Sequence, residues 1–296
     1  MYLPERVGFE MAKALRWAGY AFAAIVGLIL IVAAAIWLLS SSKLNARVQA
    51  KPERLVQPTP AQQAGIEREA RSLGCFSCHG EGLRGNKMFD EPLIGTVWAP
   101  NLTFVAAHAD DQQLARAIRQ GIGVDGRSLL VMPSEAFQHL SDQEIAGLVA
   151  MIRSQPRTGA ATPGNSYGPL SRLGFVMGEF KTAPQLVSEY AVKEPIPVGS
   201  QYEAGRQLAI TRCSGCHAAD LTGKEVKPGE TSPDLTIAGA YDLVAFKKLI
   251  REGIPAGGQK VPMMGSTARS DLRNMTDPEI EAVFAYLQAR AQRVSR

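Results

Sequence analysis

The sequence has few cysteines, few aromatic residues and little excess of either charge. Four cysteines in 296 residues are too few for a disulfide-dense scaffold. Aromatic residues make up 7%, and 32 basic against 28 acidic side chains leave a net charge of +4, which argues against a dedicated nucleic-acid-binding protein. Hydrophobic residues make up 46%, which is typical of a folded chain, and at about 100 to 200 residues per domain the length predicts two domains.

The stretch 18–39 contains no charged residue and consists mostly of Ala, Ile, Leu and Val. Its 22 residues would form a helix of roughly 33 Å, enough to cross a hydrocarbon core of about 30 Å. Trp17 and Tyr20 lie at one end and Trp37 near the other, where amphipathic rings prefer the membrane interface. We therefore predict an N-terminal membrane anchor over residues 1–42.

A cleaved signal peptide is the alternative, since Ala33-Ala34-Ala35 would suit a peptidase. The apolar run is longer than the roughly 7 to 15 residues of a signal peptide and continues past those alanines, which favours an uncleaved anchor. Basic residues do not decide the orientation, because they occur on both sides of the run: Arg6, Lys13 and Arg16 before it, and Lys43, Arg47, Lys51 and Arg54 after it.

All four cysteines fall in two copies of one pattern, Cys-x-x-Cys-His. The copies are Cys75-Phe76-Ser77-Cys78-His79 and Cys213-Ser214-Gly215-Cys216-His217. In a chain this poor in cysteine and histidine a chance copy arises on the order of 10⁻³ times, so two copies indicate a function. Two thiols three positions apart can each form a thioether to one vinyl group of a porphyrin, and the adjoining imidazole then binds the iron. The pattern predicts covalent haem c at two sites, attached through Cys75, Cys78, Cys213 and Cys216 and ligated by His79 and His217.

Two other uses of paired cysteines fit the sequence less well. A zinc site needs four nitrogen or sulfur ligands, and pooling both pairs into one site would leave the two adjoining histidines without a role. A thioredoxin-like redox pair should lie in a βαβ unit, yet no strand-like run precedes either motif.

In these two motifs and in the segments after them, the sequence resembles a membrane-anchored dihaem cytochrome c with two class I type domains in tandem. The resemblance extends from about residue 61 to the end of the chain. It implies an all-α fold, in which an N-terminal transmembrane helix is followed by two cytochrome c domains, and two covalently bound haem c groups as cofactors.

A methionine thioether is the usual ligand opposite histidine in such domains. Residues 119–134 align without a gap with residues 251–266, which places Met132 opposite Met264. Both segments lead into a helix that opens with a capping-box pattern. We expect Met132 and Met264 to be the sixth ligands of the two irons.

Met263 is the competing ligand for the second iron, because a slip of one residue is easily accommodated in an irregular loop; otherwise it would fill space beside the haem. His108 and His139 have no counterpart in the other repeat, so we expect them at the surface or at the edge of a core. Four methionines at unmatched positions are interpreted as packing residues: Met88, Met151, Met177 and Met275.

A second matched pair lies between each haem motif and the next helix, Pro100-Asn101-Leu102-Thr103 and Pro233-Asp234-Leu235-Thr236. In similar cytochromes a proline carbonyl at this place accepts a hydrogen bond from the ligating histidine and fixes its ring. The resemblance therefore assigns that role to Pro100 and Pro233, with a simple helix-blocking turn as the alternative.

Gly65 and Gly205 precede the motifs by ten and eight residues, in helices that should pack on the closing helices at Met151 and Tyr286. Tyr286 matches the aromatic residue that the family has at this crossing. Met151 departs from that pattern, which leaves the crossing in the first domain less well defined.

Helical periodicity predicts helices over 61–75, 110–120, 141–154, 202–214, 240–252 and 277–292, and no strong strand alternation competes with it. We expect a spacer at 43–60 that lifts the first domain off the bilayer, cytochrome c domain 1 at 61–155, an interdomain linker at 156–199 and cytochrome c domain 2 at 200–296. The apolar segment 170–180 within the linker is expected to pack between the domains, with contact to the membrane as the alternative.

The resemblance also implies assembly outside the cytoplasm, with a single-pass anchor in the bacterial inner membrane and both haem domains on the periplasmic side. Irons with histidine and methionine ligands have no vacant position, so we expect single-electron transfer, no catalytic residue and no small-molecule substrate. The expected partners are redox proteins, such as a dehydrogenase, a quinol-oxidising complex or a terminal oxidase, and no nucleic acid. The alternatives are a dihaem peroxidase-like enzyme, in which one iron must open, and a haem-based redox or gas sensor.

Overall fold

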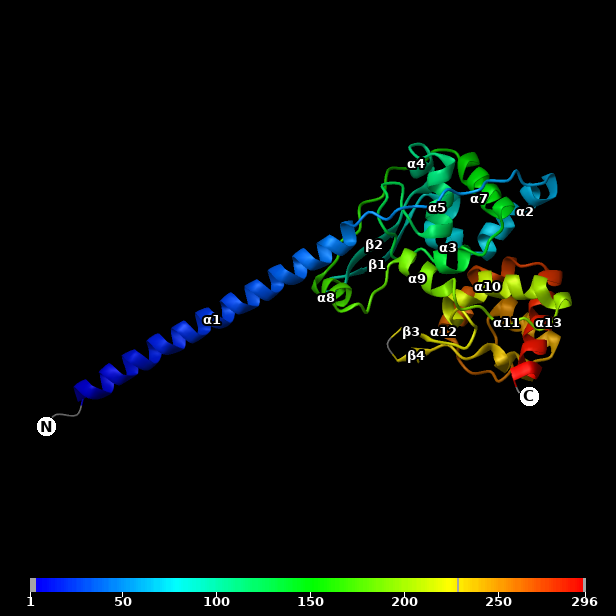
Figure 1. Cartoon of the computed structure of the whole chain (residues 1–296). Helices are drawn as coiled ribbons and strands as arrows, with labels where there is room; N and C mark the ends of the chain where they lie inside the picture. The colour runs from blue at the N-terminus through cyan, green and yellow to red at the C-terminus, as the bar shows by residue number, and fades with distance from the viewer. Residues whose placement is uncertain (1–3, 228, 295–296) are drawn as a thin grey trace.

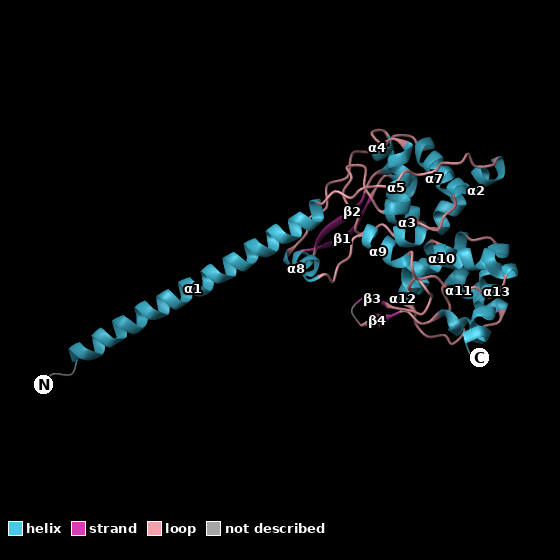
Figure 2. Ribbon diagram, viewed as in Figure 1, coloured by secondary structure: helices cyan, strands magenta, loops and turns pink. Residues whose placement is uncertain are grey.

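The computed structural model describes residues 4–227 and 229–294, with side chains from Glu10 onward except that of Lys227. Helix α1 (Pro4–Asn45) projects as a long rod from a body of two lobes (Figure 1). Helices dominate both lobes and strands are few (Figure 2). The chain is therefore an all-α protein with an N-terminal apolar helix, as the sequence predicts.

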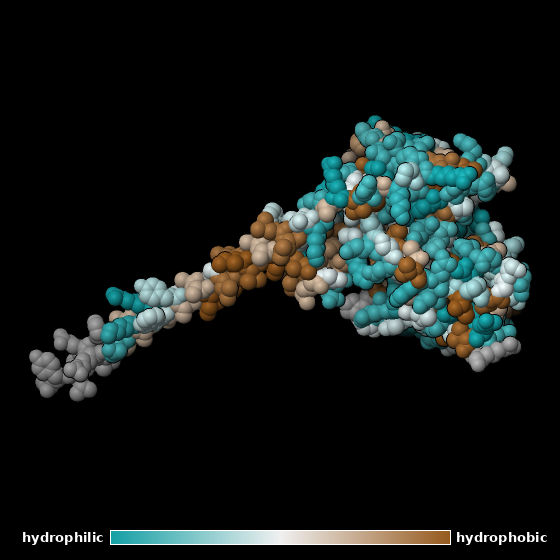
Figure 3. All heavy atoms as spheres, in the orientation of Figure 1, coloured by the Kyte–Doolittle hydropathy of each residue, from teal (hydrophilic) through white to brown (hydrophobic). Residues whose placement is uncertain are grey.

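Helix α1 is apolar and exposed along most of its length. Its part Glu10–Asn45 is long and apolar enough to cross a membrane, and none of its most apolar window is buried against the rest of the chain. The rod is brown along much of its length in Figure 3, which marks apolar side chains in contact with the surroundings. In water such a surface is unfavourable, which is consistent with a single-pass membrane anchor.

Domain 1 is the lobe built on a core that includes Ile66, Leu114, Ile145 and Leu148. Amphipathic helices surround this core because their apolar residues recur every three to four positions. Its elements are α2 (Pro60–Ser72), α3 (Cys75–His79), η1 (Glu81–Leu83), β1 (Asn86–Glu91), β2 (Gly95–Ala99), α4 (Leu102–Ala106), α5 (Asp111–Gln120), α6 (Ser134–Phe137) and α7 (Asp142–Ser154).

Domain 2 is the lobe built on a second core that includes Ala209, Phe246, Ile280 and Tyr286. Its closing helix α13 packs along the helix that carries the second cysteine motif. Its elements are η2 (Ser200–Tyr202), α10 (Glu203–His217), β3 (Glu225–Lys227), β4 (Glu230–Thr231), η3 (Leu235–Ala240), α11 (Leu243–Glu252), α12 (Pro262–Ser270), η4 (Leu272–Asn274) and α13 (Asp277–Val294).

Each of the six expected helices is present, with ends within three residues of those predicted. Although the sequence shows no strong strand alternation, two short antiparallel pairs form, β1 with β2 and β3 with β4. Strand β1 has no alternation of apolar and polar residues, because almost all its side chains are exposed and three of them are charged. Its backbone pairing, from Asn86 opposite Ala99 to Glu91 opposite Gly95, holds it instead.

The segment expected as a spacer lies on domain 1. Arg47 forms a β-bridge with Arg127, and the buried carboxylate of Glu53 accepts a hydrogen bond of 2.7 Å from Arg119. A free spacer would leave these groups in water, so residues 46–59 run along the lobe rather than holding it away from α1.

The linker region adds helices α8 (Pro169–Met177) and α9 (Ala183–Tyr190); it packs on domain 1 as far as α9, and after α9 it bonds to domain 2, where Tyr286 donates to the carbonyl oxygen of Ile196. Ser166 pairs with Thr96 of β2 through backbone hydrogen bonds of 2.9 and 3.2 Å, and α9 lies against α6. Helix α8 lies against the C-terminal end of α1 (Figure 1). The expectation that the apolar segment 170–180 packs between the domains was therefore wrong, and so was packing for Met177, which is exposed.

The two expected glycine crossings differ. A Cβ atom on Gly205 would lie 2.0 Å from the carbonyl oxygen of Ala282 and 3.0 Å from Cβ of Tyr286, so only glycine allows α10 to approach α13 this closely. A Cβ on Gly65 would meet nothing within 4 Å. In domain 1, α2 packs on the closing helix α7 as expected, with Met151 in the same core, but the close contact is between Ile66 and Gly147 and not at Gly65.

Candidate haem-binding sites

The first cysteine motif forms one turn of helix, α3. Gly74 precedes it with φ of 79° and Gly80 follows it with φ of 75°, conformations that glycine adopts without strain. This turn puts Cys75 and Cys78 on successive positions of the same helical face. His79 is 8% exposed, and its Nδ1 lies 2.8 Å from the carbonyl oxygen of Pro100.

The second motif forms the last turn of α10 and repeats this geometry. His217 is 9% exposed, and its Nδ1 lies 2.9 Å from the carbonyl oxygen of Pro233. These are the two prolines to which the resemblance assigns this contact. Because Nδ1–H donates to the carbonyl, Nε2 of each ring is left to face a metal.

Both proline segments are held in place by the residue after the proline. The side chain of Asn101 accepts a hydrogen bond of 3.1 Å from the Thr103 amide and caps α4. The side chain of Asp234 accepts one of 2.8 Å from the Thr236 amide and caps η3. The proline carbonyl that accepts each histidine hydrogen bond therefore directly precedes a capped helix N-terminus.

Burial favours the uncharged forms of the motif side chains. It lowers the pKa of His79 and of His217, which keeps both imidazoles neutral and able to bind a metal. Burial raises the pKa of Cys75 and of Cys213 to about 12, which is opposite to the lowered pKa of a thioredoxin-like redox cysteine.

The chemistry of the donor set fits haem c better than a zinc ion. Within residues 4–227 and 229–294, no three side chains of His, Cys, Asp or Glu come together as a metal cluster. A pooled four-cysteine zinc site is therefore not formed. Each motif instead offers two thiols and one oriented imidazole, which is the set that a haem c site takes from the protein on that side.

The expected methionines are each partly buried against the core of their domain. Met132, just before α6, is partly buried and packs against the core of domain 1. Met264, inside α12, packs in the same manner against the core of domain 2. Met263 is one residue away on α12 and does not belong to the group of side chains packed on that core. The ligand assignments themselves stay predictions.

The two unmatched histidines have ordinary protein partners. His108 is exposed and its Nδ1 lies 2.9 Å from the carbonyl oxygen of Phe104. His139 is partly buried, 3.8 Å from Glu194.

Two further glycines recur at the same place in both domains and were not predicted from the sequence. Gly85 and Gly223 each lie six residues after the motif histidine, and their amides donate to the carbonyl oxygens of His79 and His217 at 2.7 and 2.9 Å. Both have φ of +89°. A Cβ would lie 2.8 Å from the Asn101 amide nitrogen in the first case and 2.3 Å from the Ser232 oxygen in the second. The matched spacing His-x₅-Gly was the available signal.

The two motifs come close to the boundary between the lobes. Ser77, inside the first motif, donates a hydrogen bond to Asp271 of domain 2. Arg212, next to the second motif, donates one of 3.1 Å to Ser72 of domain 1. Both cysteine-bearing helices therefore contact the opposite domain.

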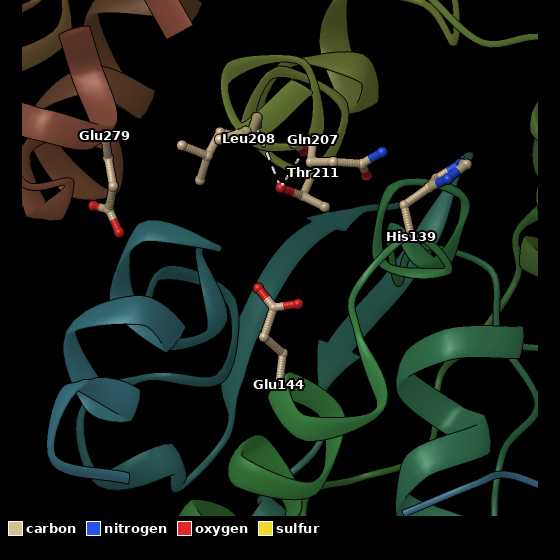
Figure 4. A pocket seen from close by; sticks show the side chains of 7 residues that line it. His139, Glu144, Gln207, Leu208, Thr211 and Glu279 are labelled. Atoms are coloured by element: carbon tan, nitrogen blue, oxygen red, sulfur yellow. Dashed lines mark hydrogen bonds between the residues drawn. The ribbon is translucent and has the colours of Figure 1, made fainter. Parts of the chain in front are cut away.

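A cavity of about 320 Å³ lies between the domains and is lined from both sides, as Figure 4 shows for Glu144 and His139 of domain 1 and Gln207, Thr211 and Glu279 of domain 2. None of the motif residues or expected iron ligands lines it. We assign this cavity to the interdomain contact and not to a haem site.

The helical lobes, each with a Cys-x-x-Cys-His turn and a histidine held by a proline carbonyl, are those of a c-type cytochrome. Comparison with protein families agrees: residues 202–291 match the family Cytochrome c, and residues 62–152 match Cytochrome C oxidase, cbb3-type, subunit III. No curated protein matches the chain in a sequence search. The chain belongs to the cytochromes c, with two of their domains in tandem, and is a haem-based electron-transfer protein.

Proposed function

We propose that this chain carries two haem c groups and passes single electrons between redox proteins while anchored to a membrane. One observation carries the proposal: the same arrangement of buried histidine, proline carbonyl and paired cysteines occurs twice, and both motif helices contact the opposite domain. Two such sites in contact would let an electron enter through one domain and leave through the other.

Each feature that the two sites share would have a separate role. Cys75, Cys78, Cys213 and Cys216 would form the thioethers, His79 and His217 would bind iron from one side, and Met132 and Met264 from the other. When bound, haem c supplies reversible one-electron chemistry at iron. The carbonyls of Pro100 and Pro233 would hold the imidazoles in one tautomer, and the two hydrophobic cores would exclude water from the porphyrin faces.

We further propose residues 61–155 and 200–296 as the haem-binding units. Residues 1–42 would be the anchor, with its N-terminus in the cytoplasm and both haem domains on the periplasmic side of a bacterial inner membrane. What supports this side is the requirement for extracytoplasmic haem attachment, as in the similar cytochromes.

The partners we propose are redox proteins, and the match of domain 1 to an oxidase subunit family favours a complex of the terminal oxidase type over a dehydrogenase or quinol-oxidising complex. Electrons would then pass from a periplasmic or membrane donor through this chain to the oxidase.

The test begins with the intact chain purified from a host that attaches haem c. Mass spectrometry after denaturation should find two covalent haem adducts, and the oxidised protein should show the sulfur-to-iron charge-transfer band of methionine ligation. Met132→Ala and Met264→Ala should each remove about half of that band, because each removes one of two thioether ligands.

Met263→Ala is the matched control, since it truncates the neighbouring side chain of the same helix. Loss of about half of the band in Met263→Ala but not in Met264→Ala would transfer the assignment to Met263. Fewer than two adducts would refute the dihaem proposal. A high-spin iron with peroxide turnover would favour the peroxidase-like enzyme, and rapid binding of carbon monoxide to the reduced protein would favour a sensor.

A further inference from the structure

Helix α8 is tied to the C-terminal end of α1 by side chains from both. Nη1 of Arg172 donates hydrogen bonds of 2.9 and 3.0 Å to the hydroxyls of Ser40 and Ser41. Nζ of Lys43 donates one of 2.9 Å to the carbonyl oxygen of Phe175, in the last turn of α8, where a cation is favourable. Ser40 is fully buried by this contact. Helix α8 is therefore held against α1 by side-chain hydrogen bonds from both helices.

One face of α8 and its neighbourhood is apolar and exposed. Leu170, Leu173 and Met177 follow each other at intervals of three and four residues, so they share a face of the helix, and 52%, 38% and 65% of their surfaces are exposed. The amide of Leu170 donates to the carbonyl oxygen of Leu93 at 3.0 Å, which brings the exposed β1–β2 turn alongside. We call this surface the α8 patch: Leu93, Ile94, Leu170, Leu173, Met177 and Phe180.

The opposite side of α8 explains why the patch faces outward. Ser171 is buried and its hydroxyl donates a hydrogen bond of 2.7 Å to the carbonyl oxygen of Ile94. Phe175 is buried, with its ring 5.9 Å from that of Tyr167 and 5.6 Å from that of Phe180. The helix thus has a packed face and an exposed face, and the exposed one is apolar, which is the reverse of an ordinary surface helix.

The position of α8 along α1 indicates what covers the patch. The apolar run of α1 ends at Leu39, and Arg172 binds the next two residues, about 3 Å further along the helix axis at 1.5 Å per residue. The guanidinium of Arg172 also lies 5.6 Å from the ring centroid of Trp37, an aromatic residue of the kind found at membrane interfaces. A bilayer that covers the run of α1 therefore has its surface at α8.

We propose that the α8 patch is embedded in the surface of the same bilayer that α1 spans, as a second, interfacial attachment of domain 1. In Figure 3 the apolar surface of α1 continues onto the body at the place where α8 lies. Apolar side chains of an amphipathic helix bind at the boundary of headgroups and acyl chains, several ångströms deep. The inference rests on the proposed single-pass anchor and adds that domain 1 keeps a fixed orientation to the membrane, because a single helix alone would leave it free to swivel.

The test is photocrosslinking of the intact, haem-loaded chain in vesicles of phosphatidylcholine and phosphatidylglycerol. Benzoylphenylalanine replaces Leu170 in one variant and Met177 in another, both exposed positions where a larger side chain is tolerated. Ile29, within the apolar run of α1, is the positive control, and Val244 of domain 2, which is 78% exposed, is the matched negative control.

Lipid adducts at positions 170 and 177 support the proposal, with yields near that at position 29 and roughly ten times that at position 244, because only immersed side chains meet acyl chains. Adducts at position 29 without adducts at 170 and 177 overturn it while leaving the anchor intact. Absence of lipid adducts at position 29 refutes the anchor itself, and the haem count of the same samples tests the electron carrier separately. The same variants are also photocrosslinked in the membranes of expressing cells. A protein adduct at position 170 or 177 there would show that the patch is a subunit contact and would overturn the lipid assignment.

Discussion

Arg212 of domain 2 places Nη2 3.5 Å from a carboxylate oxygen of Glu69 in domain 1. Both side chains are largely buried, and Oε1 of Glu69 has no hydrogen-bond partner among the described residues. Burial is the main cause that raises the pKa of Glu69 to about 7, helped by the nearby carboxylate of Glu144, while Arg212 and Arg68 oppose the shift. The contact between the haem domains therefore contains a carboxyl group that titrates near neutral pH.

The first prediction concerns the stability of the protein against pH. The folded chain keeps the proton on Glu69 up to about pH 7, whereas the unfolded chain releases it near 4.5, so this group stabilises the fold fully below pH 4.5 and ceases to do so as the pH rises to 7. Glu69→Gln should remove this slope. The measurement is the thermal midpoint of the haem-loaded chain between pH 4.5 and 8, followed by circular dichroism.

Glu67→Gln is the matched control, because Glu67 lies on the same helix but is mostly exposed and pairs with Arg71 at the surface. It should leave the slope unchanged. A Glu69→Gln variant with the same pH slope as the unaltered chain would assign the titration to another group.

The second prediction removes the cation of this pair. Arg212→Met leaves Glu69 buried without its opposite charge, and breaking a buried pair from one side destabilises by about 3 kcal/mol, so the thermal midpoint at pH 8 should fall by several degrees. The loss should be smaller at pH 5, where Glu69 is protonated. Arg71→Met, which breaks two surface pairs and the stacking of Arg71 on the ring of Phe76, should cost about 1 kcal/mol at either pH. Equal losses for the two variants would contradict a buried interdomain pair.

The haem motifs could be predicted because covalent attachment demands a fixed spacing. Cys75, Cys78 and His79 must lie on one turn whatever surrounds them, and the repeat at Cys213 made chance improbable. The core helices could be predicted for a similar reason, since their apolar residues recur with the period of the helix.

The surroundings of α8 could not be predicted because they depend on contacts between segments far apart in the sequence. An apolar segment with Leu170 and Met177 looks the same in the sequence whether it packs between domains or faces a membrane. What decides is the pairing of Lys43 with the carbonyl of Phe175, 132 positions away. The same holds for Arg212 and Glu69, which nothing in their local sequence connects.

The third prediction tests the glycines that lie six residues after the motif histidines. Gly223→Ala places a Cβ 2.3 Å from the Ser232 oxygen and 2.8 Å from the carbonyl carbon of Pro233, so the proline segment must shift and the histidine hydrogen bond weakens. Since that bond makes the imidazole a stronger donor to oxidised iron, its loss should raise the reduction potential of the second domain and lower the thermal midpoint.

Gly126→Ala is the control for backbone strain alone, because Gly126 has a similar φ of +81° but no atom within 4 Å of its added Cβ. It should cost about 1 kcal/mol and leave both potentials unchanged. A change of potential in Gly126→Ala as large as that in Gly223→Ala would show that local strain, and not the proline carbonyl, is responsible.

The fourth prediction separates the two proposed membrane attachments. A chain that begins after residue 42, exported behind a cleavable signal, loses the apolar run together with Ser40 and Ser41 but keeps Lys43 to cap α8. We expect a water-soluble protein with two haems that still binds vesicles weakly through the α8 patch, since a few apolar side chains give only reversible binding. The measurement is the fraction of protein that sediments with vesicles before and after an alkaline carbonate wash. The shortened chain should be released by the wash and the intact chain retained, and adding Leu170→Ser and Met177→Ser to the shortened chain should abolish its sedimentation. Retention of the shortened chain after the wash would show that residues 1–42 are not the integral anchor.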